Sequence, residues 1–377
     1  MTQKLRSKNY AVIGLGFGDE GKGLTTNSLC HNYPESLVVR YSGGQQAGHT
    51  VTLPDGKSHV FSNFGAGTLL GAPTYWSEYC TFDPVGMLNE FKILRSKGVN
   101  PIIYINKNCP ITTPYEKHLN QMSDRYIKNG TCGVGVGATY AREEKFQSLL
   151  AGDIFYKQIF TAKYRAVHQF YDFESWTLDV GGQFPDSINE ILSMPDNFRF
   201  VNHLYEVPVN GSYIFEGSQG LLLDQNIGFF PNVTRSNTGS KNILGLGFAP
   251  TPILITRAFQ TRHGNGFMTN EDLPHNITDN PNETNVLNRY QGAFRKSLLD
   301  LSLLKYGIER DNYLRRNKEK QLVITCLDLV KNEYRYTIDG EIIAHADEDS
   351  FVDGIKKYLD IDIVHRVHSP SALFEIK

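Results

Sequence analysis

Two glycine-rich stretches of this sequence carry side chains that suit phosphate chemistry. The first, GLGFGDEGKG at residues 14–23, contains Asp19 and Lys22, and the second, GGQQAGHT at residues 43–50, contains His49. Glycines let backbone amides approach an anion closely, because no Cβ stands in the way. A carboxylate, an ammonium group and an imidazole beside bound phosphates can hold a metal ion, balance charge and move protons. We call the two stretches the glycine loop and the histidine loop.

The spacing within the glycine loop imitates a P-loop but does not complete it. Gly16, Gly21 and Lys22 stand at the P-loop positions. Gly23 follows where that motif needs a Ser or Thr hydroxyl for magnesium, so another group must hold the metal. The dinucleotide fingerprint also fails, because Asp19 stands where its third glycine belongs. The Asp19 carboxylate is therefore the expected ligand for a hard divalent cation.

Strands must position these two loops. The apolar runs Tyr10–Ile13 and Leu37–Tyr41 each predict a short strand ahead of one of the loops. Ligands usually bind at the carboxyl ends of strands in an open α/β sheet, so we expect the two loops to face each other. Further strands are predicted at residues 101–106, 213–215, 252–256 and 322–329, and helical segments at 112–128 and in an insertion at 172–192.

This alternation of strands and helices predicts an α/β fold. We expect a single large domain, residues 1–377, with a central, mostly parallel sheet, the P-loop-like glycine loop, and peripheral helices and insertions. A chain of 377 residues can form one continuous core in α/β enzymes, and no linker rich in Pro, Gly or Ser divides this one. Residues 270–288, rich in Asn, Asp and Pro, are expected to form a mobile loop.

The composition narrows the class of protein. With 38 basic and 40 acidic residues the net charge is -2, which argues against a broad nucleic-acid-binding surface. Five cysteines without a C-x-x-C pair indicate neither a disulfide framework nor a zinc site. The first residues lack the apolar core of a signal peptide, and no run approaches the ~20 apolar residues of a membrane span. We expect a cytoplasmic protein that binds neither nucleic acid nor membrane.

Taken together, the two loops resemble those of the adenylosuccinate synthetase family, which joins aspartate to a 6-oxopurine nucleotide at the expense of GTP. The match rests on GDEGKG at 18–23 and GGQQAGHT at 43–50. It continues in the family's order with FEGSQG at 215–220, VTRSN at 233–237 and RAFQTRHGNG at 257–266. The resemblance implies a homodimeric, Mg²⁺-dependent ligase of purine biosynthesis, with GTP, IMP and L-aspartate as substrates.

The resemblance also assigns roles to individual residues. Asp19 becomes the base that removes the purine N1 proton, and His49 stabilises the 6-oxygen during phosphoryl transfer, with Lys22 as the third catalytic group. The Asp19 carboxylate and the Gly48 carbonyl become magnesium ligands. Asp328 corresponds to an aspartate that reads guanine, since a carboxylate accepts both N1–H and the 2-amino group. The implied triphosphate contacts are Gly18, Asp19, Glu20, Gly21, Lys22, Gly23, Gly48, His49, Thr50, Asp328 and Ser369.

The implied purine-monophosphate site departs from the family's pattern. Cys132 replaces a second phosphate-binding threonine, and Val134 stands where a charged residue is usual. An arginine that the family lends from the neighbouring subunit falls near Phe146, with only Arg142 and Lys145 close by. The implied contacts to the purine monophosphate are Asp19, Gln46, Ala47, Thr131, Cys132, Gln219 and Thr234.

The implied aspartate site also departs from the family's pattern. Several consecutive arginines capture aspartate in the family, whereas this chain offers Arg289 and Arg295. A guanidinium suits a carboxylate because it can bind both oxygens at once, and we predict that Arg295 does so. Arg262 is expected near the site. Cys326 stands where the family has a lysine ahead of the guanine-reading aspartate.

Three functions remain open from the sequence. IMP is the favoured acceptor because Asp19 is present, and GTP is favoured over ATP as donor. The short chain and the altered arginine segment favour the alternative, a GMP- or dGMP-specific enzyme of the viral branch that uses ATP, dATP or GTP. A purine-nucleotide-sensing protein without turnover is the third, and the presence of both Asp19 and His49 argues against it.

Overall fold

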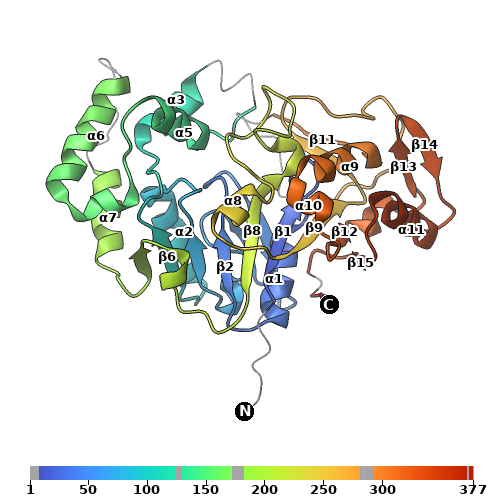
Figure 1. The fold of residues 1–377 in the computed structure, drawn as a ribbon, viewed down its shortest axis with the longest axis horizontal. Helices are drawn as coiled ribbons and strands as arrows, with labels where there is room; N and C mark the ends of the chain where they lie inside the picture. Colours follow the sequence, from blue (N-terminus) through green and yellow to red (C-terminus); the bar gives the residue numbers. More distant parts are fainter. Residues whose placement is uncertain are drawn as a thin grey trace, which may run out of the picture.

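The computed structural model describes residues 8–123, 130–171, 182–280, 283, 292–371 and 373–376. At its centre lies a nine-stranded sheet whose pairings are all parallel, in the order β15-β12-β9-β1-β8-β2-β5-β6-β7 (Figure 1). Its strands are β1 (Tyr10–Gly14), β2 (Leu37–Arg40), β5 (Thr74–Trp76), β6 (Ile103–Asn106), β7 (Phe198–Val201), β8 (Tyr213–Gly220), β9 (Thr251–Arg257), β12 (Gln321–Thr325) and β15 (Ile363–Arg366).

Strand β1 lies in the middle of this sheet, between β8 and β9. All five of its residues are buried, as expected for a continuous apolar run in a parallel sheet whose two faces are covered. Tyr10 pairs with Ile214 on one side and with Thr251 on the other. Because parallel strands end at the same edge, the glycine loop after β1 lies beside the carboxyl ends of β8 and β9.

Helix α1 (Lys22–Asn32) follows the glycine loop, and its residues from Lys22 to Cys30 are buried. The residue before it, Gly21, has a φ of 98°, in the left-handed region that glycine adopts most easily. A Cβ at Gly21 would lie 2.9 Å from the side chain of Thr325 on β12. The glycine therefore allows a tight turn into α1 and puts Lys22 in the first helical turn, where free amides favour anions.

The remaining helices surround the sheet, with α6 and α7 at one end of the molecule and α11 at the other (Figure 1). They are α2 (Pro84–Ser96), α3 (Pro114–Met122), α5 (Val136–Lys145), α6 (Lys157–Tyr171), α7 (Gln183–Leu192), α8 (Lys241–Gly245), α9 (Leu301–Arg310), α10 (Asn312–Arg316) and α11 (Glu348–Leu359). Short 3₁₀ turns are η1 (Thr68–Leu70), η2 (Ala151–Phe155), η3 (Leu204–Glu206), η4 (Leu221–Leu223) and η5 (Leu327–Val330).

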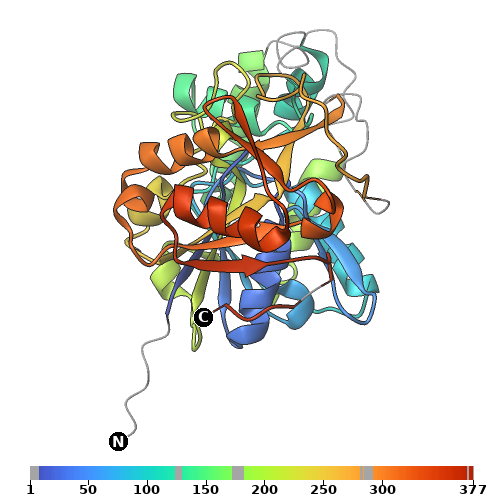
Figure 2. The ribbon, with the colours of Figure 1, turned by 90° about the vertical axis from the view of Figure 1, so that its right-hand side faces the viewer.

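Two smaller sheets complete the described fold. A four-stranded sheet has the order β10-β11-β13-β14, and it lies toward the α11 end of the molecule (Figure 2). Its strands are β10 (Phe259–His263), β11 (Phe294–Asp300), β13 (Arg335–Ile338) and β14 (Glu341–Ala344). The hairpin of β3 (His49–Thr52) and β4 (Ser58–Phe61) begins at the end of the histidine loop, so His49 has a partner strand that holds its backbone.

Two predicted elements differ from the structure. The strand predicted at 322–329 ends at Thr325, because Cys326 adopts a left-handed φ of 59° that breaks the extended chain, and Asp328 lies in the turn η5. The helix predicted at 112–128 is α3, which ends at Met122. Residues 124–129, residues 172–181 of the predicted insertion, and most of 281–291 lie outside the described residues.

The large parallel sheet with surrounding helices confirms the predicted α/β fold class. The assignment of residues 1–377 to a single domain stays a prediction. Within the ranges that the structure describes, no helix has both the length and the apolar character that crossing a membrane requires.

Removal of the Asp311 carboxylate should destabilise the fold. Asp311 is 8 % exposed and accepts hydrogen bonds from the Ser240 amide (2.7 Å) and hydroxyl (2.6 Å) and from the Tyr313 and Leu314 amides that begin α10. Asp311→Ala leaves several buried donors unpaired, so we expect a loss of ~3 kcal/mol in the free energy of unfolding, measured in urea.

A matched control for this variant is Asp347→Ala. Asp347 also caps a helix, α11, by accepting from the Ser350 amide at 2.8 Å, but its cap is exposed to solvent. Its loss should cost ~1 kcal/mol. Equal losses for the two variants would contradict the importance of burial at Asp311.

Candidate active site

Two adjoining cavities lie where the central strands end. The glycine-loop cavity, of about 320 Å³, is lined by the glycine loop, the histidine loop and the turn after β12. The second cavity, of about 700 Å³, is lined by residues of α3, α5 and the segments before them and by the chain around residues 230–235. Four residues line both: Gln46, Gln219, Leu223 and His263.

Most of the predicted site residues line one of these cavities. In the glycine-loop cavity are Asp19, Glu20, Gly21, Lys22, Gly23, Gln46, Ala47, Gly48, His49, Thr50, Gln219, Asp328 and Ser369. In the second cavity are Gln46, Thr131, Cys132, Gln219 and Thr234. Gly18 and Arg295 line neither. Gly18 lies directly against the shared wall, because a Cβ on it would stand 3.0 Å from the Gln219 side-chain oxygen.

Asp19 occupies the turn of the glycine loop. Its φ of 56° lies in the left-handed region, which non-glycine residues seldom adopt. Arg257, the last residue of β9, donates a hydrogen bond from Nε to the Asp19 carbonyl, and its guanidinium also binds Glu283 at 3.1 Å. The arginine thus fixes the backbone at the residue that was expected to act as base and metal ligand.

The Glu20 carboxyl group occupies the middle of the glycine loop. It is 4 % exposed, accepts a hydrogen bond from the Gly16 amide, and lies 3.6 Å from Lys22 Nζ. Burial raises its pKa to about 7, although Lys22 and the Gly16 amide oppose the shift. A group that competes with phosphate for the loop amides is therefore only partly ionised near neutral pH.

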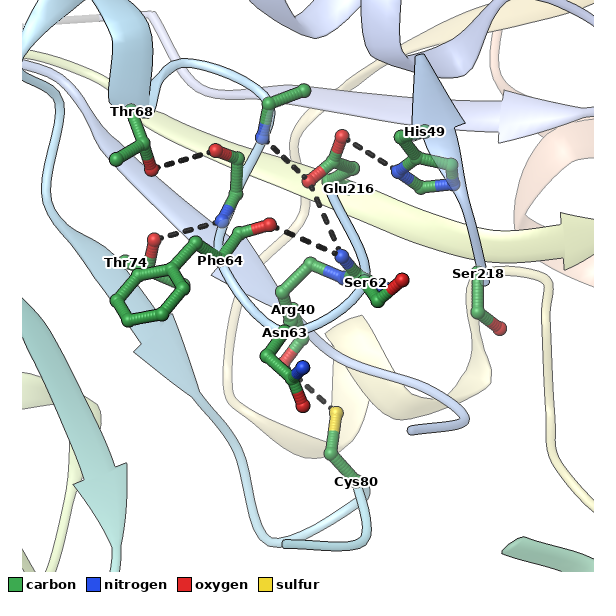
Figure 3. Close-up of polar contacts among 12 residues, drawn as sticks. Arg40, His49, Ser62, Asn63, Phe64, Thr68, Thr74, Cys80, Glu216 and Ser218 are labelled. Atoms are coloured by element: carbon green, nitrogen blue, oxygen red, sulfur yellow. Dashed lines mark hydrogen bonds and ion pairs between the residues drawn. The ribbon is translucent and has the colours of Figure 1, made fainter. Parts of the chain in front are cut away.

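His49 is held by Glu216 (Figure 3). Its Nδ1 lies 2.8 Å from Glu216 Oε1, and both side chains are buried. Nε2 makes no hydrogen bond within the described residues, and His49 lines the glycine-loop cavity. Burial holds the pKa of His49 below its usual value, although the Glu216 carboxylate acts in the opposite direction. The imidazole can thus present one ring nitrogen to a ligand while the other is fixed.

Hydroxyl, thiol and amide groups mark the polar part of the second cavity. The Thr131 hydroxyl donates to Asn120 Oδ1 at 2.9 Å, and the Cys132 thiol lies 3.9 Å from the Gln46 carbonyl. Burial raises the pKa of Cys132 to about 12, so this thiol stays neutral and can only act as a weak donor. The shared Gln219 places this polar part next to the glycine loop.

The far part of the glycine-loop cavity suits a purine base. Asp328, Leu329, Val367 and Pro370 line it together with Ser369. A carboxylate beside aliphatic side chains can accept hydrogen bonds in the plane of a base while the apolar groups pack on its faces.

Arg295 lines neither cavity, and its guanidinium binds groups of its own chain. Nη1 lies 2.7 Å from each oxygen of Glu271, Nε donates to the Gly264 carbonyl, and Nη2 donates to the Gly266 carbonyl. Its predicted role toward aspartate stays a prediction. Arg289 lies outside the described residues.

Sequence reasoning missed three groups that the structure brings to the site. Glu216 holds His49, Arg257 holds the glycine loop, and His263 lines both cavities. Glu216 and Arg257 were detectable, because each is a charged residue within or at the end of an apolar run predicted to be a strand of the ligand edge. Nothing in the sequence indicates that His263 lies between two cavities.

The sequence was then compared with known proteins. The family model described as adenylosuccinate synthetase matches residues 11–357. The chain belongs to the adenylosuccinate synthetase family. Among curated relatives, the adenylosuccinate synthetase of Thermoplasma volcanium is 27% identical over 361 residues, covering 89% of this chain and 80% of the relative. That of Pseudomonas paraeruginosa is 29% identical over 370 residues, covering 92% and 85%.

Solved structures share the fold. The fully ligated adenylosuccinate synthetase of Plasmodium falciparum matches with a TM-score of 0.74 and 17% identity, covering 96% of this chain and 98% of that chain. The succinoaminodeoxyadenylate synthetase of cyanophage S-2L, bound to dGMP and dATP, matches with a TM-score of 0.62 and 15% identity, covering 97% and 94%. The predicted family and enzyme class, an adenylosuccinate synthetase-type ligase, are therefore confirmed.

An aromatic pair and a buried arginine lie near the second cavity. Phe146, near which the resemblance places an arginine lent by a neighbouring subunit, stacks on Phe170 with ring centroids 4.6 Å apart. The nearby Arg142 is buried, and its Nε lies 2.6 Å from Glu116 Oε1. The Arg142 guanidinium therefore pairs with a carboxylate of its own chain.

Glu20 gives a pH-dependent test of the glycine loop. Its folded-state pKa of about 7 exceeds the ordinary value of 4.5, so between these pH values the folded chain keeps a proton that the unfolded chain releases. This group's contribution to stability is therefore lost as pH rises through that window. Glu20→Gln should be more stable than the natural protein by up to ~3 kcal/mol at pH 8 and show little difference at pH 4.5.

The measurement is urea unfolding of both proteins at several pH values. A difference between them that stays constant from pH 4.5 to pH 8 would show that Glu20 does not titrate in this range.

Proposed function

We propose that this protein joins L-aspartate to C6 of IMP, giving adenylosuccinate, through a 6-phosphoryl intermediate formed at the expense of GTP. The observation that carries this proposal is that Asp19 and His49 line one cavity with the glycine loop. A base, a hydrogen-bond donor and a phosphate-binding loop are the groups that phosphorylation of a 6-oxopurine needs.

In the first step Asp19 accepts the N1 proton of the purine, and the 6-oxygen attacks the γ-phosphorus. The bond between the γ-phosphorus and the bridging oxygen breaks, and GDP leaves. His49 stabilises the charge on the 6-oxygen, while Lys22 and the loop amides balance the transferred phosphoryl group. In the second step the aspartate amine attacks C6 and expels phosphate. Close placement of the three substrates supplies a large part of the rate.

Members of this family use Mg²⁺, and two oxygens of the site suit it. The Asp19 carboxylate and the Gly48 carbonyl belong to residues that line the glycine-loop cavity. Among the described residues no group of three or more His, Cys, Asp or Glu side chains could hold a metal. A small number of protein ligands fits Mg²⁺, which keeps waters and substrate phosphates in its shell. The ion would neutralise phosphate charge between these two residues.

The second cavity is the proposed site of the purine monophosphate. Gln219 and Gln46 line both cavities, so an acceptor there would reach the groups around Asp19. Thr131, Cys132 and Thr234 are the proposed phosphate contacts, and Ala47, which lines the glycine-loop cavity, is a further proposed contact to the purine monophosphate. For Arg295 to hold aspartate, a substrate carboxylate must replace Glu271 as its partner. We also propose that the protein forms a homodimer and is located in the cytoplasm.

A second acceptor, dGMP or GMP, is favoured by the altered arginine segment, where this chain offers Arg289 and Arg295 in place of several consecutive arginines. The phage enzyme of similar fold is bound to dGMP and dATP. The presence of Asp19 keeps IMP ahead, as the viral branch often replaces this residue.

The deciding experiment is a phosphate-release assay with aspartate that crosses IMP, dIMP, GMP and dGMP with GTP, ATP and dATP. We expect release that requires IMP, GTP and aspartate together. Asp19→Asn and His49→Gln should each lower the rate by about 10²-fold, on the usual scale of acid–base groups. Release with GMP or dGMP alone would replace IMP as acceptor, and release with no combination would refute the proposed reaction.

The preference for guanine over adenine in the triphosphate substrate is tested at Asp328. An Asn there presents an amide NH₂ toward one of the two donors of guanine, and the loss of a buried hydrogen bond costs ~1–3 kcal/mol. Asp328→Asn should lower kcat/KM for GTP by about 10–100-fold and affect ATP much less. An equal loss of kcat/KM with GTP and with ATP would mean that Asp328 does not distinguish the two bases.

A further inference from the structure

The end of α1 carries two polar side chains that hold the last described part of the chain. Asn32, the final residue of the helix, donates from Nδ2 to the Phe374 carbonyl at 3.0 Å, and the Tyr33 hydroxyl donates to the Ile376 carbonyl at 3.3 Å. Both views of the fold draw the C-terminus beside α1 (Figure 1, Figure 2). We call residues 373–376 the tail segment.

Apolar contacts also hold the tail segment. Ile376 is 3 % exposed and belongs to the same buried apolar cluster as Leu29 and Cys30 of α1. The Phe374 side chain packs against this cluster, and its ring centroid lies 5.9 Å from that of His365 on β15. These contacts oppose the conformational entropy that would otherwise free so short a segment.

Tyr33 is itself fixed from the central sheet. The hydroxyl of Tyr10, the first residue of β1, donates to the Tyr33 hydroxyl at 2.6 Å, and the two ring centroids lie 5.0 Å apart. The Tyr33 hydroxyl thus accepts from Tyr10 and donates to Ile376. This series of hydrogen bonds joins the start of β1, the end of α1 and the tail segment.

A segment just before the tail segment lines the glycine-loop cavity. Val367, Ser369 and Pro370 belong to the part of the cavity that suits a purine base. Val367 is buried and tied to the central sheet, because its amide donates to the Ile324 carbonyl at 2.9 Å. We call residues 367–371 the base-side segment.

After its first residue the base-side segment has few contacts of its own. His368 binds Glu348 at 2.9 Å, but this pair is exposed to solvent and such pairs contribute little. The hydroxyls of Ser369 and Ser371 lie 3.2 Å apart, and within the described residues Ser369, Pro370 and Ser371 form no hydrogen bond with any other part of the chain. The position of Ser369 and Pro370 therefore depends on the anchors on either side of them in the sequence.

The helix that anchors the tail segment also begins in the cavity. Its first residue, Lys22, lines the glycine-loop cavity, whereas Asn32 and Tyr33 line neither cavity. A helix of 11 residues is roughly 16 Å long. An effect of Asn32 or Tyr33 on a bound nucleotide must therefore pass through the tail segment.

We propose that Asn32 and Tyr33 are positioning residues for the base of the triphosphate substrate. They hold the tail segment, the tail segment limits the movement of the base-side segment, and the base-side segment closes the cavity near Asp328. The presence of a purine base in this part of the cavity rests on the proposed function. The attachment of the tail segment to α1 does not, and it can be observed without substrate.

The first test measures release of the tail segment in the absence of nucleotide. Chymotrypsin cleaves after aromatic residues, and cleavage after Phe374 removes residues 375–377, which mass spectrometry of the intact protein detects. The double variant Asn32→Ala with Tyr33→Phe loses both hydrogen bonds but keeps the apolar contacts of the segment. We expect it to be cleaved there about 5-fold faster or more than the natural protein. An unchanged rate would overturn the proposal.

The matched control is His31→Ala. His31 lies in the same last turn of α1, is exposed, and makes no hydrogen bond to the tail segment within the described residues. Its substitution should leave the rate of cleavage after Phe374 unchanged. An acceleration equal to that of the double variant would reflect a general loosening of the end of α1, and the attachment through Asn32 and Tyr33 would be refuted.

The second test measures nucleotide binding by isothermal titration calorimetry. In the double variant the Kd for GDP should rise about 5-fold or more, because the base meets a less ordered wall. The Kd for IMP, which the proposed function places in the second cavity, should not change. An unchanged Kd for GDP, or an equal rise for both nucleotides, would refute the positioning role.

Phe374 supplies a variant pair that leaves α1 intact. Phe374→Ser removes the ring that packs against the apolar cluster, so it should raise the Kd for GDP in the same way. Phe374→Tyr keeps the ring and should bind GDP as the natural protein does. Natural affinity in Phe374→Ser would contradict the proposal even if the double variant at α1 failed to fold.

Where the phosphate-release assay gives turnover, the double variant should show a higher KM for GTP with little change in kcat, since the base takes no part in the chemical step. A lower kcat at an unchanged KM for GTP would contradict the positioning role. If the natural protein binds no GDP, the proposed triphosphate site fails, and the chymotrypsin experiment still decides whether Asn32 and Tyr33 hold the tail segment.

Discussion

The carboxylate of Glu216 lies where the central sheet meets the chemistry of the site, and the surrounding structure is arranged to keep it charged. It can remain ionised in the core only because the register of β2 and β8 brings Arg40 beside it and the turn before η1 supplies the Ala66 amide. Its position within β8, opposite the last residue of β2, also brings it within hydrogen-bond distance of His49. A change in strand register of one residue would turn these side chains to the opposite face of the sheet.

Much of the fold was predictable because its signals are local. The apolar runs at Tyr10–Ile13 and Leu37–Tyr41 have the length and composition of buried parallel strands, and the glycine loop needs backbone conformations that few other sequences allow. The two loops were therefore expected at one edge of the sheet. The end of β12 was not predictable, because a single left-handed residue, Cys326, stops a strand that its apolar composition would continue.

The contacts of charged side chains were harder to predict, since they depend on residues far away in the sequence. Arg295 has the side chain expected to bind a carboxylate and does bind one, but that carboxylate is Glu271 of the same chain. Arg142 likewise pairs with Glu116 in place of a ligand. A residue type fixes which chemistry is available, whereas the tertiary structure decides which partner uses it. Glu216 and Arg257 were missed for the same reason.

The wall between the two cavities has an energetic consequence. Gln46, Gln219, Leu223 and His263 each line both cavities. A ligand that displaces one of these side chains in one cavity therefore also reshapes the other. Any coupling between the two fillings that this produces is reciprocal, because thermodynamics requires the same factor in either direction.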